Sequence, residues 1–116
     1  MPLAAKYLFV VSMDVKPEKE ALFNEVYDTE HVPYLLKVPG VRAVTRLKTV
    51  PASVVIGGEK KTLDGAGMPN YVAIYELDSP DILTSPAWIK AAETGRWPSE
   101  VRPHTFNRHH VMRQVI

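Results

Sequence analysis

The sequence of 116 residues contains no cysteine. This absence excludes disulfide bonds, thiolate nucleophiles and cysteine-based metal or iron–sulfur sites, and it suits a reducing cytoplasm, where we expect the protein to reside. The sequence also has no apolar run long enough to span a bilayer. Its first apolar run, residues 7–11, is followed by no small-residue cleavage site and is typical of a strand. We therefore expect no membrane partner.

A strong net charge is also missing. The formal net charge is +1, and the basic residues are scattered, with Lys60-Lys61 and residues 108–113 as the only local concentrations. Each concentration is too short for a nucleic-acid-binding surface, so we expect no nucleic-acid partner. With 46% hydrophobic and 23% charged residues, the composition is typical of a folded protein. The length corresponds to a single domain, residues 1–116.

Histidine is scarce, and its spacing argues against a metal site. The four histidines include the adjacent pair His109 and His110, which point to opposite faces of a regular strand. No His-x-His or His-x-x-x-His pair is present in the sequence. Because a metal centre needs several such ligands on one side, we expect no metal.

The elements follow the order strand, helix, strand, strand, helix, strand. We predict strands at 5–15, 41–49, 71–77 and 105–116, and helical regions at 17–36 and 79–93. Val32-Pro33 predicts a kink in the first helix, and residues 97–103 are predicted to be irregular. The order predicts an α+β fold of the ferredoxin-like βαββαβ type, a four-stranded antiparallel sheet with two helices on one face.

The first strand is apolar on both of its faces. Its alternating sets are Tyr7, Phe9, Val11 and Met13 on one side and Leu8, Val10 and Ser12 on the other. One layer of helices covers only one face of the sheet. Leaving the other face in water would be costly, because burying a large apolar side chain is worth ~1.5–3 kcal/mol. We therefore predict a homodimer through the sheet face, with the long connection 51–70 as a protruding or partner-contacting arm.

The clearest candidate for chemistry is His31. Phe23, Tyr27 and His31 are spaced by four residues and share one helix face, which carries most of the apolar residues and is predicted to look inward. An inward imidazole can perform proton chemistry near neutral pH, with Asp28 or Tyr27 orienting it. The alternative is a core histidine that ties the kink at Pro33 to the next segment.

Further side chains are candidates for a ligand pocket. Trp88 and Trp97 supply large apolar area and one donor each, which suits the wall of an aromatic pocket, and core packing is the alternative for both. Arg108 and His110 share one face of the last strand. On the helix side they would form a polar site for an anionic ligand, and on the other side a dimer contact. Tyr75, on strand 71–77, is a further candidate for ligand binding.

Five segments carry a resemblance to a known family. They are Tyr27-Asp28-x-Glu30-His31-x-Pro33, Val38-Pro39-Gly40-Val41, Tyr71-Val72-Ala73-Ile74-Tyr75-Glu76-Leu77, Ser85-Pro86-Ala87-Trp88 and Arg102-Pro103-His104-x-x-Asn107-Arg108. Through them essentially the whole chain resembles the dimeric α/β-barrel superfamily, in its EthD-like branch of small bacterial proteins. The resemblance implies two sheets that close into a barrel and a ligand cavity in each subunit between sheet and helices. It implies that His31 lies at the mouth or wall of that cavity.

Relatives in this superfamily include cofactor-free quinol monooxygenases, polyketide cyclases, muconolactone-type isomerases and haem-degrading enzymes. The asparagine–arginine–tryptophan constellation of the haem-degrading members has no counterpart in this sequence, so we expect no cofactor. Our first hypothesis is a cofactor-independent enzyme that acts on a small apolar or aromatic carbonyl or phenolic metabolite by proton transfer through His31, as an isomerase, cyclase, lyase or metal-free monooxygenase. The second is a non-catalytic dimeric ligand-binding or stress-associated protein that uses the same cavity.

Overall fold

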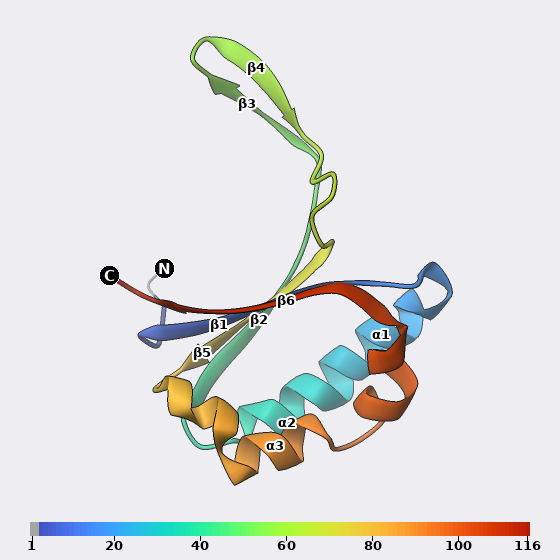
Figure 1. The fold of residues 1–116 in the computed structure, drawn as a ribbon, viewed down its shortest axis with the longest axis vertical. Coiled ribbons are helices and arrows are strands. Elements are labelled where there is room, and N and C mark those ends of the chain that lie inside the picture. Colours follow the sequence, from blue (N-terminus) through green and yellow to red (C-terminus); the bar gives the residue numbers. More distant parts are fainter. Residues whose placement is uncertain (1–2) are drawn as a thin grey trace.

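The central sheet is antiparallel and has the strand order β2-β5-β1-β6 in the computed structural model, which describes residues 3–116. Its strands are β1 (Tyr7–Val15), β2 (Val41–Lys48), β5 (Tyr71–Leu77) and β6 (Thr105–Gln114). The helices lie together on one face of this sheet (Figure 1). The ferredoxin-like α+β fold expected from the order of the elements is confirmed.

The helical segments are short. They are η1 (Pro17–Lys19), α1 (Glu20–Val26), η2 (Tyr27–His31), α2 (Val32–Leu36), η3 (Pro80–Thr84), α3 (Pro86–Ala92), η4 (Trp97–Val101) and η5 (Arg102–His104). The irregular structure expected for residues 97–103 is wrong, because this segment forms the helical turns η4 and η5. Pro98 lies in the first turn of η4, where its missing N–H leaves no bond unmade. Only Trp97 and Val101 of η4 are buried, which is too few for a periodic signal.

The first helix contains a wider turn directly before Pro33, at the position where the sequence predicts a kink. η2 is a π-helical turn, in which the Val32 N–H donates to the Tyr27 carbonyl five residues earlier. Proline has no N–H to donate, and in an α-helix its ring crowds the carbonyl four residues before it. The wider turn directly before Pro33 relieves that crowding, and α2 continues on from α1 (Figure 1).

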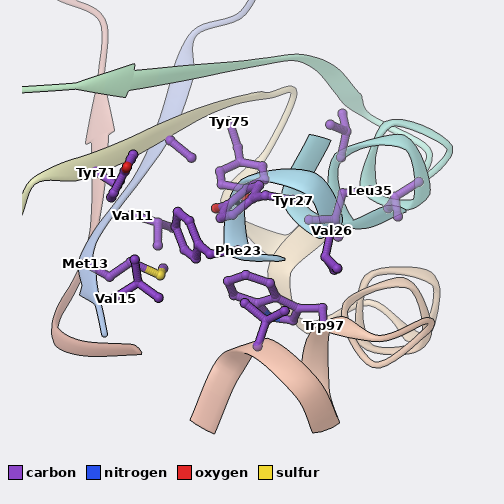
Figure 2. Packing of buried hydrophobic residues seen from close by; sticks show 14 of the residues in the cluster. Val11, Met13, Val15, Phe23, Val26, Tyr27, Leu35, Tyr71, Tyr75 and Trp97 are labelled. Atoms are coloured by element: carbon purple, nitrogen blue, oxygen red, sulfur yellow. Dashed lines mark hydrogen bonds between the residues drawn. The ribbon is translucent and has the colours of Figure 1, made fainter. Parts of the chain in front are cut away.

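The core lies between the sheet and the helices. The strands contribute alternate side chains to it, Val11, Met13 and Val15 from β1 and Tyr71, Ala73, Tyr75 and Leu77 from β5. Phe23 of α1 packs among them, with its ring centroid 4.9 Å from that of Tyr71 and 6.0 Å from that of Trp97 (Figure 2). Large aromatic rings therefore fill much of the space between the two layers.

The connection 51–70 forms an arm outside the central sheet. Its strands, β3 (Ala52–Ile56) and β4 (Glu59–Leu63), pair only with each other within residues 3–116. Gly57 and Gly58 join them with φ values of 59° and 81°, the conformation that a two-residue hairpin turn requires. The arm projects away from the helices (Figure 1) and is largely exposed. The protruding hairpin is confirmed, and its contact with a partner stays a prediction.

The sheet face opposite the helices carries apolar side chains from all four strands. They are Leu8, Val10, Leu47, Val72, Ile74 and Val111. Val10 is paired with Ile74 on one neighbouring strand and with Val111 on the other. No helix of the described residues covers this face (Figure 1), and the homodimer through it stays a prediction. A membrane-crossing helix would have to be longer and more apolar than any that the structure describes.

Candidate functional site

A cavity of about 150 Å³ lies between the helix-facing side of the sheet and the helices. Much of its wall is aromatic and comes from Phe9, Tyr27, Tyr75, Trp88 and Trp97. Its polar part comes from His31, Arg102, Arg108 and His110. The cavity thus combines apolar walls with a few polar groups, as small-molecule sites do. It also brings together all the residues expected to bind or act on a ligand except Asp28.

His31 lies where two π-helical turns meet. It is the last residue of η2, and Trp97, on which it stacks, is the first residue of η4. The centroids of these two rings are 4.4 Å apart with an interplanar angle of 19°, while the Tyr27 ring meets the imidazole edge-on at 5.2 Å. Single π turns are frequent at functional sites. Here the two turns hold the imidazole by packing it between two aromatic rings.

The His31 side chain combines burial with an unused nitrogen. The residue is only 6% exposed, and among the described residues Nδ1 has no hydrogen-bond partner. Most buried polar atoms are partnered, so a buried Nδ1 without a partner is unusual and marks His31 as a candidate functional residue. Burial lowers the pKa of His31 to about 4, and the charge of Arg102 acts in the same direction while Glu93 opposes it. The imidazole is therefore neutral at pH 7 and both accepts and donates hydrogen bonds.

Tyr27 and Tyr75 place a second polar group on the cavity wall. Their hydroxyl oxygens are 2.8 Å apart, so one hydroxyl donates to the other. That bond uses one of the two hydroxyl protons, and the other proton has no acceptor in the part of the chain that the structure describes. Burial raises the pKa of both phenols, which keeps them protonated. The pair can therefore donate one hydrogen bond to a ligand.

Asp28 lies away from the cavity, so the orienting role expected for it is wrong. Its carboxylate is exposed and accepts a hydrogen bond from Arg46 Nη1 at 2.8 Å. The Arg46 guanidinium also lies 4.5 Å from the centroid of the Tyr27 ring. Consecutive helical residues point about 100° apart, so Asp28 does not share the inward face of Tyr27. Stacking on Trp97 orients His31 instead.

Arg108 and His110 of β6 line the cavity. They therefore lie on the helix side of the sheet and not on the side predicted to contact a second copy. They lie on the helix side because His110 is paired with Val11, a core residue of β1. The His110 ring stacks on that of Phe9, with centroids 5.9 Å apart. Partial burial lowers the pKa of His110, and the nearby charge of Arg108 adds to the effect.

Phe9 and Arg102 are among the lining residues that were not predicted as site residues from the sequence. Phe9 alternates with the core residues Val11 and Met13, and that alternation marks it as helix-facing. Arg102 donates from Nη1 to the Glu93 carboxylate at 2.9 Å and contacts it again through Nη2. It belongs to η5, inside the segment interpreted as irregular, so no periodicity marked its position.

Solved structures of other proteins share the fold of this chain. No protein-family model and no curated protein sequence matches this chain. A solved structure of a MhuD mutant, with two manganese protoporphyrin IX molecules bound per active site, matches with a TM-score of 0.64 at 12% identity, over 95% of this chain and 94% of that one. An ethyl tert-butyl ether D (EthD) family protein from Bacillus halodurans matches with a TM-score of 0.57 at 15% identity, over 95% and 99%. The chain has an EthD-like fold. The resemblance to the EthD-like branch is thus confirmed at the level of the fold.

Proposed function

We propose that this EthD-like protein is an enzyme that transfers a proton on a small aromatic or apolar carbonyl or phenolic metabolite, with its own side chains and no resident cofactor. The observation that carries the proposal is the buried His31 imidazole, which lines a cavity with aromatic walls and has no partner for Nδ1 among the described residues. The hydroxyls of Tyr27 and Tyr75 supply a second polar group to the same cavity. Proton transfer needs two such groups, one to accept a proton and one to stabilise the charge that develops.

The neutral state of His31 defines its part in the reaction. A pKa of about 4 makes the imidazole a weak base. A hydrogen bond from the tyrosine pair to a substrate oxygen stabilises the negative charge that forms when a neighbouring carbon loses its proton. That negative charge also raises the pKa of His31, because opposite charges attract strongly in a site of low dielectric. The tyrosine pair thus holds the oxygen while His31 takes the proton.

A metalloporphyrin, which the MhuD mutant binds, does not fit this cavity. The volume of about 150 Å³ is below the ~300 Å³ at which pockets for drug-sized ligands begin, and a porphyrin is larger than most such ligands. The indole of Trp97 also covers one face of the His31 ring. No step of the proposed reaction therefore passes through a porphyrin.

The second candidate function is a protein that binds a small ligand without changing it. One observation favours it, because no carboxylate bonds to Nδ1 of His31 within the described residues. Catalytic histidines are commonly oriented by such a partner. Both functions use the same cavity, and they differ in whether His31 is needed for turnover.

Deuterium exchange separates the two functions. The proposed enzyme should catalyse exchange of solvent deuterium into the carbon next to the carbonyl of an enolisable aromatic ketone, with neutral phenylacetone and anionic phenylpyruvate as probes and proton NMR as the readout. His31→Phe keeps a ring stacked on Trp97 but removes both nitrogens. We expect this variant to exchange ~10²–10⁴-fold more slowly than the wild type.

The matched control is His109→Phe, because His109 is exposed and lies on the opposite face of the sheet. This control should exchange at the wild-type rate. Equal rates in the His31→Phe variant and the wild type would contradict the proposed enzyme. Binding of either probe without exchange above the solvent background would favour the binding protein.

A further inference from the structure

The charged residues that line the cavity are all basic. Arg102 and Arg108 line it together with two histidines, and none of its lining residues in the described chain is aspartate or glutamate. A cavity with cationic and without acidic side chains favours a ligand that carries negative charge. The two arginines differ in whether the protein already pairs them with a carboxylate.

Arg102 is already paired with a carboxylate of the protein. Its guanidinium makes two contacts with the carboxylate of Glu93, in the fork geometry typical of a strong arginine–carboxylate pair. The hydrogen bonds from Arg102 also lower the pKa of the Glu93 carboxyl, which favours its charged form. Glu93 therefore offsets part of the charge that Arg102 brings to the cavity.

Arg108 has no acidic partner within residues 3–116. Its charge nevertheless reaches the cavity, because it acts to lower the pKa of both the Tyr27 hydroxyl and the His110 imidazole. Arg108 is thus a solvent-exposed cation on the wall of the cavity, with no acidic partner among the described residues.

A β-bulge sets the position of Arg108. The pairing of β6 with β1 shifts between Ser12 and Asp14, so that Asn107 and Arg108 together oppose one residue of β1. Asn107 has a φ of 52°, and its side-chain amide donates to the Asp14 carboxylate at 3.1 Å. Bulges of this kind re-aim side chains next to active sites. At the bulge, the Asp14 carboxylate accepts a hydrogen bond from Asn107 and makes no ion pair with Arg108, which lines the cavity.

The cavity size sets the size of the apolar part of the ligand. An apolar protein cavity of about 150 Å³ binds one benzene molecule, and the cavity here has that volume. Trp88 meets the rings of Phe9 and Tyr75 edge-on, with centroid distances of 6.0 and 5.6 Å. Such walls suit one further aromatic ring.

We propose that the ligand is a single-ring aromatic acid, whose ring occupies the aromatic part of the cavity and whose carboxylate pairs with the guanidinium of Arg108. This inference rests on the proposed function, because it names the class of substrate that the same cavity takes. The carbonyl or phenolic oxygen of such a ligand then faces the tyrosine pair and His31.

Binding of benzoate and of its neutral analogue benzamide tests the charge requirement. Titration calorimetry should show benzoate binding to the wild type at least roughly tenfold more tightly than benzamide, as expected for a charge-assisted pair. Arg108→Gln should weaken benzoate roughly tenfold to a hundredfold and leave benzamide unchanged. Arg113→Gln is the matched control, since Arg113 lies on the same strand but on the opposite sheet face, and it should bind like the wild type.

The place of binding is read from the proton NMR signals of the histidines. Benzoate should shift the ring signals of His31 and His110 and leave those of His109 unchanged. The inference is overturned if benzamide binds as tightly as benzoate, if Arg108→Gln leaves benzoate affinity unchanged, or if neither molecule binds at millimolar concentration. The proposed function is judged separately, because exchange into neutral phenylacetone does not depend on recognition of a carboxylate.

Discussion

At the scale of single residues, His31 makes the stability of the fold depend on pH. Its pKa is about 4 in the folded protein, against an ordinary value of 6.5. Between these values the unfolded chain binds more protons than the folded one. The free energy of unfolding is therefore highest above about pH 6.5, falls as the pH drops through this window, and levels off below about pH 4. The whole difference corresponds to about 3 kcal/mol.

Urea unfolding at about pH 7 and at about pH 5 measures this contribution. We expect the wild type to lose about 2 kcal/mol more than His31→Phe between these two conditions. The variant keeps His110, whose pKa is also lowered, so the difference between the two proteins isolates His31. Equal losses would mean that His31 takes up its proton at an ordinary pH in the folded state.

The hydroxyl pair of Tyr27 and Tyr75 predicts a non-additive mutant cycle. Each single change to phenylalanine leaves the other buried hydroxyl without its partner, which costs roughly 1–3 kcal/mol. The double variant removes both hydroxyls and should lose clearly less than the sum of the two single variants. Chemical denaturation of the four proteins measures the coupling. Losses that simply add would show that the 2.8 Å contact contributes nothing to the folded state.

At the scale of elements, the sequence was informative where side chains alternate or repeat. The β-branched and aromatic residues of β1 and the alternation on β2 predicted strands, and the four-residue spacing of Phe23, Tyr27 and His31 predicted the inward helix face. Asp28 was misassigned because closeness in sequence was taken as closeness in space, and one helical step turns it towards solvent. Segment 97–103 was misassigned because its helical turns bury too few residues to leave a pattern.

We expect the thermal stability of the protein to be nearly independent of the arm. β3 and β4 pair with each other, and the Thr49 N–H donates to the Asn70 carbonyl at 2.9 Å where the arm leaves the sheet. We expect a variant in which Pro51 is joined directly to Asp64 to melt within a few degrees of the wild type, followed by circular dichroism, because surface loops tolerate changes in length. A collapse of the melting transition would show that the arm supports the core.

At the scale of the whole molecule, the arm makes the chain more extended than its length requires. The Cα radius of gyration is 15.8 Å, against about 13 Å for a compact domain of this length. The extension lies on the side of the molecule away from the helices, as does the uncovered apolar sheet face (Figure 1). Both features suit a second copy of the chain that packs on this face.

Sedimentation equilibrium tests the predicted homodimer. The wild type should sediment as a dimer at micromolar concentration, and Val10→Lys should shift it to a monomer, because Val10 lies between Ile74 and Val111 on the uncovered face. Ile89→Lys is the matched control on α3, on the helix side of the molecule, where the side chain is already 55% exposed. A wild type that is monomeric under these conditions would contradict the prediction.

The π turn of the first helix allows buried residues spaced by four positions to stay on one face of the helix. Phe23, Tyr27, His31 and Leu35 are all buried, at intervals of four residues. On a uniform α-helix each interval overshoots a full rotation by about 40°, so Leu35 would lie about 120° around the axis from Phe23. A π turn takes more residues per rotation and absorbs the excess. Buried residues repeated strictly every fourth position therefore indicate a wider helical turn as well as an inward face. Each further interval adds about 40° of rotation that the wider turn must absorb.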